Sequence, residues 1–263
     1  MKYEEITSRK NPNIVLAASI AEKKYRDKTG LFCFEGSKLL SEILQSDYEL
    51  ECIMFTGRAF EKYGKLLDKV SQKTSKLYLV SDSVYEKITN EKSPQGIFTI
   101  AKQKKIEIFS NISQSKGIIF LDSIQNPSNL GTIARSAFSL GDYAIVCTPD
   151  CADIYNPKAI RAAMGAIFKL EFYSSGEIKE CFKKIKAGGR RVLATVLSEK
   201  AVEIQKATLC PNDCLVIGNE GNGVSEQVLQ ECDVHVIIPM QEGAESLNAA
   251  AACAIFIWEA NRQ

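Results

Sequence analysis

The sequence predicts an α/β protein built from two successive domains. Short apolar runs alternate with amphipathic segments along the 263 residues, which is the pattern of strands connected by helices. In the second half, runs such as 117–122 and 214–217 are almost continuously apolar, as in a parallel sheet covered on both faces. The polar, lysine-rich stretch 101–116 lies between the two alternations and predicts a linker. We therefore expect a small N-terminal α/β/α domain over residues 1–105 and a parallel-sheet domain over residues 106–263.

The individual elements follow from apolar spacing and turn residues. Apolar positions at helical spacing predict one long helix over 13–28. The other N-terminal elements are expected to be strands at 31–35, 52–55, 77–80 and 97–100, with helices at 37–44, 59–70 and 83–89. In the second domain we expect strands at 117–122, 143–147, 168–172, 191–194, 214–217 and 234–238, with helices at 129–140, 157–164, 177–187, 225–231 and 246–261.

The charge balance argues against a simple polycationic nucleic-acid binder, because the chain has 33 basic and 32 acidic residues and a net charge of +1. That average hides an asymmetry, since residues 1–110 carry a net charge of +4 and residues 111–263 a net charge of −3. No apolar run approaches the roughly 20 residues that a bilayer requires, and residues 1–13 lack the apolar stretch of a signal peptide. We expect a cytoplasmic protein without a membrane segment.

Cysteine and histidine usage predicts no metal site. The nine cysteines are scattered without a Cys-x-x-Cys pair, and the single histidine, His235, lies in a strand-like run. Reduced thiols that pack as small apolar groups are the expected state. One histidine in a strand also argues against catalysis by a serine–histidine or cysteine–histidine pair.

Unusual residues follow three of the expected strands in the second domain, where open parallel sheets bind their ligands. After 117–122, Asn126-Pro127 breaks the strand, and Ser128 or Asn129 is expected to cap the helix that follows. Arg135 lies about one turn into that helix among apolar neighbours, which predicts a partly buried charge. After 214–217 comes a glycine-rich turn whose spacing differs from that of a dinucleotide fingerprint. Glu220 in that turn would repel a phosphate, so a cofactor with a cationic or hydroxyl-bearing part is expected. After 234–238, Ser246 and Asn248 open an alanine-rich helix, whose small side chains permit close approach.

These three segments resemble, in order, the three motifs of the SpoU/TrmH family of RNA ribose 2′-O-methyltransferases, which belong to the SPOUT superfamily. The first motif is matched by Asn126, Pro127, Asn129, Gly131, Ile133 and Arg135. The second is matched by Gly218, Glu220, Gly223 and Ser225. The third is matched by Ile238, Pro239, Met240, Ser246, Leu247 and Asn248. The resemblance covers residues 117–262, and the first hundred residues resemble the family's ribosomal-protein-like substrate-binding domain. One departure is Ala250, where family members commonly carry a serine.

The resemblance implies a metal-independent enzyme that uses S-adenosyl-L-methionine to methylate a ribose 2′-hydroxyl, with 23S ribosomal RNA as the expected substrate. It implies catalytic roles for Asn129, Arg135, Glu220, Ser246 and Asn248. The implied cofactor-binding residues are Thr195, Gly218, Asn219, Gly223, Ile238, Pro239, Met240, Ser246 and Leu247. In the family the arginine is proposed to accept the 2′-hydroxyl proton. A guanidinium stays protonated and has no acceptor, so we favour a phosphate anchor that also stabilises the developing alkoxide.

The resemblance also implies an RNA-binding surface, a homodimer and a deep trefoil knot, although general topology rules make knots very rare. The expected RNA-binding residues are Arg9, Lys10, Lys23, Lys24, Arg26, Arg135 and Arg161. Phe256 and Trp258 on the last helix are the expected dimer contacts. The knot would explain why Gly221 and Gly223 are small, because threaded backbones pass close together.

Three alternatives stay open from the sequence. Transfer RNA is the second substrate class, and the resistance methylases of the large ribosomal subunit are a subset of the first. A non-catalytic RNA-binding protein that retains the fold is opposed by the intact motif residues. An oxidoreductase that uses NAD is disfavoured by the glycine order and by the missing ribose-binding acid.

Overall fold

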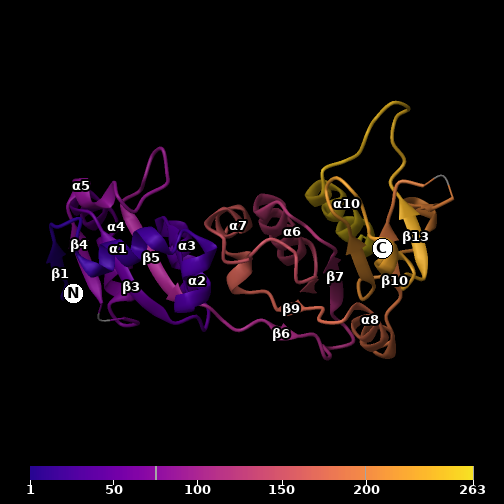
Figure 1. The fold of residues 1–263 in the computed structure, drawn as a ribbon, viewed down its shortest axis with the longest axis horizontal. Coiled ribbons are helices and arrows are strands. Elements are labelled where there is room, and N and C mark those ends of the chain that lie inside the picture. Colours follow the sequence, from indigo (N-terminus) through magenta and orange to yellow (C-terminus); the bar gives the residue numbers. More distant parts are fainter. Residues whose placement is uncertain (75, 199, 263) are drawn as a thin grey trace. The chain divides into compact units, whose positions relative to one another are not determined.

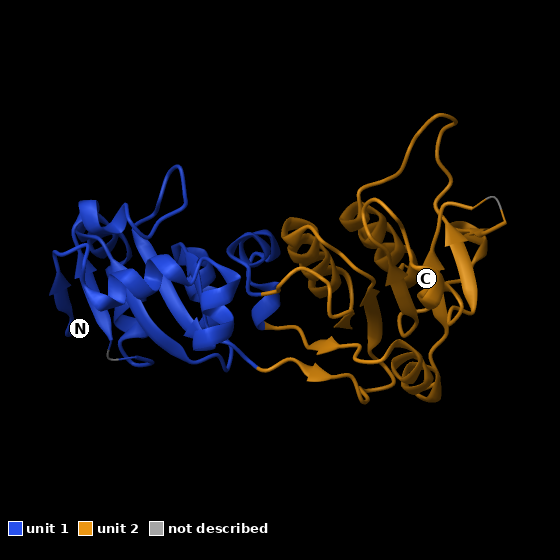
Figure 2. Ribbon diagram, viewed as in Figure 1, with its two compact units in different colours: residues 1–104, 155–168 blue, residues 105–154, 169–263 orange. Residues whose placement is uncertain are grey.

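A computed structural model describes residues 1–74, 76–198 and 200–262. The chain forms two compact units (Figures 1 and 2). Unit 1 contains residues 1–104 and 155–168, and unit 2 contains residues 105–154 and 169–263. The segment 155–168 therefore packs with the first unit although it follows the second unit's first strands. The boundary at 105/106 stays a prediction about separately folding domains.

Unit 1 is built on a five-stranded mixed sheet with the order β1-β4-β3-β5-β2. Strands β1, β4 and β3 are parallel, whereas β5 runs antiparallel to both β3 and β2. The elements of this unit are β1 (Glu4–Ile6), α1 (Pro12–Ser19), α2 (Lys23–Thr29), β2 (Leu31–Glu35), α3 (Ser37–Ile43), β3 (Leu50–Phe55), α4 (Gly57–Val70), β4 (Leu77–Val80), α5 (Asp82–Tyr85), β5 (Ile97–Lys102), α7 (Pro157–Ala163) and the 3₁₀ turn η1 (Ala166–Phe168).

Alternation along β2 places its side chains on opposite faces of the unit 1 sheet. Cys33 packs in a core with α1 residues such as Ile14. Phe32 instead contacts the ring of Tyr155, with centroids 4.8 Å apart, and Phe34 contacts Phe168 at 5.5 Å. These aromatic contacts explain why 155–168 belongs to unit 1.

Two predicted elements, one in each predicted domain, are corrected. The single helix expected over 13–28 is two helices, α1 and α2, because the chain turns after Ser19 and buries Ile20 completely. The strand expected at 168–172 begins only at Phe172, and residues 166–168 form a 3₁₀ turn instead. Strand β1 is not predicted, because two of its three residues are exposed glutamates.

Unit 2 contains an eight-stranded sheet with the order β11-β13-β10-β12-β7-β8-β9-β6, and all its pairings are parallel. Its elements are β6 (Glu107–Ile108), β7 (Gly117–Leu121), α6 (Pro127–Leu140), β8 (Tyr143–Cys147), β9 (Phe172–Ser174), α8 (Ile178–Ala187), β10 (Val192–Thr195), β11 (Val202–Glu203), η2 (Ile204–Lys206), β12 (Cys214–Ile217), α9 (Glu226–Leu229), β13 (Val234–Ile237) and α10 (Ala249–Asn261). The predicted parallel sheet is confirmed, and its central strands β7 and β12 are buried along their whole length.

The unit 2 sheet has helices on both faces. Side chains of α8 and α9, including Phe182 and Val228, form one core with inward residues of the sheet. Helices α6 and α10 pack against each other, and they also contact β8 and β12 respectively. Strands β13, β10, β12 and β7 are neighbours and end at the same edge. The three motif-bearing loops therefore meet there, at the place where open parallel sheets bind ligands.

Candidate functional site

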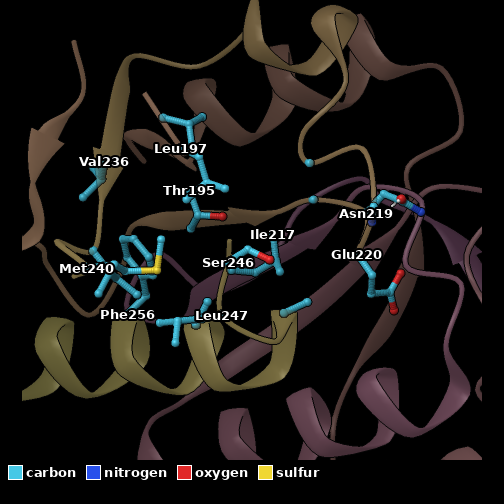
Figure 3. Close-up of a pocket in the computed structure, with 17 residues that line it drawn as sticks. Thr195, Leu197, Ile217, Asn219, Glu220, Val236, Met240, Ser246, Leu247 and Phe256 are labelled. Atoms are coloured by element: carbon cyan, nitrogen blue, oxygen red, sulfur yellow. Dashed lines mark hydrogen bonds between the residues drawn. The ribbon is translucent and has the colours of Figure 1, made fainter. Parts of the chain in front are cut away.

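A cleft of about 730 Å³, counting the part open to solvent, lies at the carboxyl ends of β10, β12 and β13. Figure 3 shows Met240 and Phe256 at one end of it, Asn219 and Glu220 at the other, and Thr195 and Ser246 between them. The lining residues are Thr195, Val196, Leu197, Ile217, Gly218, Asn219, Glu220, Gly221, Gly223, Val236, Ile238, Met240, Ser246, Leu247, Ala249, Ala252 and Phe256. The wall is thus mainly apolar, with a few polar groups and one carboxylate.

Most residues predicted to bind the cofactor line this cleft. They are Thr195, Gly218, Asn219, Gly223, Ile238, Met240, Ser246 and Leu247. Pro239 is exposed beside it and is absent from the lining. Ser246 and Leu247 lie in the loop before α10, because the helix begins at Ala249 and not at 246 as expected.

The Glu220 carboxylate binds the start of α6. Its Oε1 accepts hydrogen bonds from the Asn129 side chain at 2.8 Å and from the Asn126 backbone N–H at 3.1 Å, and its Oε2 accepts one from the Gln125 N–H at 3.2 Å. Asn126, and not Ser128 or Asn129 as expected, caps α6 through its own side chain, which accepts from the Ser128 N–H. The second motif therefore holds the first in place at the helix N-terminus, where a negative charge is favoured.

The third motif joins the same network through Asn248. Its side-chain N–H₂ donates to Asn129 Oδ1 at 3.0 Å, while its Oδ1 accepts from the N–H groups of Ala250 and Ala251 and so caps α10. Asn129, only 8% exposed, stands between Glu220 and Asn248 and bonds to both. Three loops that are distant in sequence are thus connected by one chain of side-chain hydrogen bonds.

This network keeps Glu220 ionised. Partial burial raises the pKa of Glu220, but the hydrogen bonds from Asn129 and from the backbone N–H groups outweigh it and hold the pKa below its ordinary value. The carboxylate therefore carries its negative charge at neutral pH, next to the cleft. That is the charge expected opposite a cationic ligand.

The glycine-rich turn is tied into a compact loop by its own backbone. Asn219 and Gly223 exchange both backbone hydrogen bonds at 2.9 Å. A Cβ added to Gly218 would lie 2.2 Å from backbone atoms of Gly223 and Val224, so only glycine fits there. A Cβ on Gly221 would meet nothing closer than 3.7 Å. The expectation that close backbone packing requires glycine at 221 and 223 is therefore corrected, because the position with that packing is Gly218.

Residues outside the three motifs form hydrogen bonds that hold the glycine-rich turn at the end of β7. Ser123 has a left-handed backbone (φ 57°), which is unusual for a residue with a side chain. Its N–H donates to Thr148 Oγ1 at 2.9 Å, its hydroxyl donates to Asp150, and its carbonyl accepts from the Asn219 side chain at 2.7 Å. These contacts were not predicted, although Ser123 and Thr148 directly follow the expected strands 117–122 and 143–147 and that position could have indicated them.

Arg135 departs from expectation. The apolar neighbours on α6 predict a partly buried charge, but the Arg135 side chain is exposed, because Ile133, Ala134 and Ala137 turn to the core instead. Among the described residues, its guanidinium forms no hydrogen bond or ion pair. It also lies outside the lining of the cleft. Arg135 is therefore free to bind an anion from solvent.

The prediction for Arg26 as an RNA contact is wrong. Arg26 is only 1% exposed, and its guanidinium donates to the carbonyl groups of Ile20 and Ala21 at 3.1 and 2.6 Å. It therefore binds the carbonyl groups at the turn after α1, which lose their helical partners there. A charged group can be buried here because its donors are satisfied.

The other predicted RNA contacts in unit 1 are exposed, and most have protein partners. Arg9 pairs with Glu86 at 3.1 Å, Lys23 with Asp27 at 2.8 Å and Arg161 with Glu91 at 2.7 Å. Each of these ion pairs is at the surface and can exchange for another anion at small cost.

Lys10 and Lys24 are exposed as well. The ammonium of Lys24 lies 5.9 Å from the centre of the Tyr25 ring. Both side chains point their charge to solvent and stay candidates for RNA contact.

Two findings bear on metals and membranes. In residues 1–74, 76–198 and 200–262, no three histidine, cysteine or acidic side chains gather in a way that could hold a metal ion. Over the same ranges, no helix is long and apolar enough to cross a bilayer. All nine cysteines are described and are free thiols.

The fold and the site define a methyltransferase domain of the SpoU type. The model of the SpoU rRNA methylase family matches residues 116–258, which is more than half of the chain. The chain therefore belongs to this family. Residues 11–99 match an MRM3-like substrate-binding domain. The predicted family is confirmed, and so is the expected α/β fold, which solved structures share over nearly the whole chain.

Several relatives match over nearly the whole chain. The chain is 28% identical to the 23S rRNA (guanosine(2553)-2′-O)-methyltransferase RlmP of Bacillus subtilis, covering 97% of this chain and 98% of that protein. It is 26% identical to the 23S rRNA (uridine(2479)-2′-O)-methyltransferase of Streptomyces viridochromogenes, covering 98% and 92%. The structure of an AdoMet-bound rRNA methyltransferase from Sinorhizobium meliloti superposes with a TM-score of 0.86 at 26% identity, covering 99% and 98%.

Proposed function

We propose that this protein methylates a ribose 2′-hydroxyl in 23S ribosomal RNA, with S-adenosyl-L-methionine as the methyl donor. The observation that carries the proposal is the hydrogen-bonded series Glu220–Asn129–Asn248, which joins the three family motifs at one edge of the cleft. Relatives that match almost end to end are named as 23S rRNA 2′-O-methyltransferases and support the substrate class.

The residues of the cleft suit this cofactor. Its apolar wall, with small Ala249 and Ala252 on one side, fits a flat adenine ring. Thr195, Asn219 and Ser246 offer hydrogen bonds to hydroxyl and amino groups. When bound, S-adenosyl-L-methionine supplies a methyl group on a positively charged sulfur. The ionised Glu220 at the end of the cleft provides the matching negative charge.

Arg135 is the residue we assign to the RNA. Its exposed and unpaired guanidinium presents donors in the fork arrangement that suits phosphate oxygens. Because a guanidinium has no acceptor at neutral pH, it anchors the substrate and stabilises negative charge on the 2′-oxygen, while water takes the proton. This reaction requires no metal ion.

The assignment is tested by separating transfer from cofactor binding. We expect Arg135→Ala to lower methyl transfer from labelled S-adenosyl-L-methionine to 23S rRNA by at least about a hundredfold, since an anchor and its charge stabilisation are both lost. Calorimetry should give the same cofactor affinity as the wild type. Arg135→Lys should restore part of the transfer, because it keeps the charge but loses the fork. Equal losses of cofactor affinity and transfer would contradict this division of roles.

We also propose that the chain forms a homodimer through α6 and α10. Phe138, Ile255 and Trp258 on these packed helices are 45%, 40% and 59% exposed, respectively. Phe256, which was expected at the interface, is instead buried and lines the cleft. Light scattering should show a dimer for the wild type and a monomer for Trp258→Asp, whereas a dimer of unchanged stability would contradict this interface.

We propose that the segment 239–248 and α10 form the trefoil knot of the SPOUT superfamily, with Gly218 as a point of closest backbone approach. We also propose that the protein acts in the cytoplasm, in keeping with its free thiols.

A further inference from the structure

Helix α4 of unit 1 carries a row of basic residues. Its members Arg58 and Lys62 are four residues apart, and so are Lys65 and Lys69, so that each pair shares one face of the helix (Figure 1 places α4). All four side chains are exposed. The residues that α4 buries, Ala59, Leu67 and Val70, lie at other positions around the helix. We call these four cations the α4 basic stripe.

Nothing else in the described part of the chain neutralises the stripe. None of its four members forms an ion pair or hydrogen bond there, and only Lys62 has a ring contact, 5.3 Å from the centre of Tyr63. Two acidic residues lie on the same helix. Glu61 is three residues from Arg58 and four from Lys65 but forms no ion pair in the described part of the chain, and Asp68 faces the N-terminal amine at 3.9 Å.

Several other exposed cations of unit 1 are paired with carboxylates. Lys102 pairs with Glu49 at 2.6 Å, and Lys76 pairs with Glu51. The α4 stripe is thus a group of like charges that the fold leaves unpaired.

Like charges four residues apart destabilise a helix, so the stripe weakens α4 unless an anion faces it. The backbone of Tyr63 is non-helical (φ −121°, ψ 20°), so α4 consists of two helical segments that meet at a kink, one with Arg58 and Lys62 and the other with Lys65 and Lys69. Within each segment the two cations are about 6 Å apart along the axis, at 1.5 Å per residue, and the two adjoining segments can face several phosphates of one nucleic-acid strand. The helix also lies inside residues 11–99, which match a substrate-binding domain.

We propose that the α4 basic stripe is a contact surface for the RNA phosphate backbone, separate from the predicted contacts at Arg9, Lys10 and Lys24. This inference rests on the proposed function for the identity of the polyanion. Its physical basis is counterion release, because each phosphate that a cation neutralises adds a fixed amount to the salt dependence of binding. The stripe supplies affinity without sequence selectivity, and the site in unit 2 selects the ribose.

The test compares two double variants that remove the same charge. Lys65→Gln/Lys69→Gln changes the stripe, and Lys179→Gln/Lys183→Gln changes an exposed pair of equal spacing on α8. Binding to transcribed 23S rRNA is measured between 50 and 200 mM KCl. The stripe variant should reduce the slope of log K against log salt by about 1.4–1.8 and weaken binding by about tenfold or more at 0.1 M. The α8 variant should change neither by a comparable amount, and Lys65→Arg/Lys69→Arg should bind as the wild type does.

Three outcomes overturn the proposal. One is an unchanged slope in the stripe variant, and another is an equal change in both variants, which would show attraction by net charge alone. The third is binding to phosphatidylserine vesicles that depends on the stripe while RNA binding does not. Methyl transfer is measured in parallel. A wild type that binds RNA through the stripe but transfers no methyl group refutes the proposed function only, whereas an active enzyme with an unchanged slope refutes only the stripe.

Discussion

Replacing Asn129 by alanine tests whether the three motifs act as one unit. The change removes the hydrogen bond to the Glu220 carboxylate at 2.8 Å and the one from Asn248 at 3.0 Å. A bond to a charged group contributes about 1.5–3 kcal/mol and a neutral one about 0.5–1.5 kcal/mol. Both partners are exposed, and water replaces part of each bond, so we expect a loss of about 2 kcal/mol in the free energy of unfolding. For a chain of this size that lowers Tm by about 4–8 °C.

Thermal unfolding followed by circular dichroism measures the loss, and calorimetry measures cofactor affinity. We expect affinity to fall by about tenfold, because the glycine-rich turn and the loop before α10 lose their common anchor. The matched control is Thr132→Ala, an exposed residue of the same helix whose hydroxyl donates only to the Ser128 carbonyl. It should shift Tm by no more than about 2 °C. If Asn129→Ala and Thr132→Ala behaved alike in both assays, the three loops would not be coupled through Asn129.

Three further predictions concern the turn, the carboxylate and the buried cation. Gly218→Ala should abolish measurable cofactor binding, because the added Cβ would overlap the backbone of Gly223 and Val224. Gly221→Ala should bind the cofactor normally, because the added Cβ has open space around it. Equal cofactor affinities of the two variants would contradict the steric requirement for glycine at 218. The pKa of Glu220 lies below its ordinary value of 4.5, so its ionised form stabilises the fold above that pH and the contribution is lost as pH falls through the lowered pKa. The Tm difference between wild type and Glu220→Gln should therefore be constant from pH 8 to 5 and shrink below about pH 4.5; a difference that vanished near pH 6 would contradict the direction of the shift. Arg26→Ala should lower the free energy of unfolding, measured by chemical denaturation, by about 3 kcal/mol, because it leaves the carbonyl groups of Ile20 and Ala21 without their partner. The exposed control Lys24→Ala should change it by no more than about 0.5 kcal/mol. Similar denaturation midpoints for the two variants would show that the buried guanidinium does not stabilise the fold.

Local pattern was sufficient for much of the fold. Strands such as 117–121 and 214–217 are recognisable because a fully buried parallel strand must be apolar at every position. The start of α6 was predicted only in part: the break at Asn126-Pro127 was expected, but the cap was expected at Ser128 or Asn129, whereas Asn126 caps the helix and Pro127 is its first residue. The three motif segments could be placed at one edge for the same reason, because carboxyl ends of parallel strands coincide.

Long-range packing determined what local pattern missed. In the sequence, Arg26 resembles the exposed lysines around it. In the structure, the turn after α1 places two carbonyl groups within hydrogen-bond distance of its guanidinium. The segment 155–168 reads as part of the second domain, yet its aromatic rings pack on Phe32 and Phe34 of the first unit. Neither contact can be predicted from the spacing of apolar residues, because each depends on how segments that are distant in sequence pack together. The connection of Glu220 to Asn129 is of the same kind, since 91 residues separate its two ends.

The most direct test of the account is the position of the transferred methyl group. Purified protein is incubated with unmodified 23S rRNA and labelled S-adenosyl-L-methionine, and the digested nucleosides are separated by mass spectrometry. We predict one 2′-O-methylated nucleoside with the label on the ribose, formed by the wild type and lost in Arg135→Ala. A label on a base, or a wild type that binds the cofactor but labels neither 23S rRNA nor any other RNA, would contradict it.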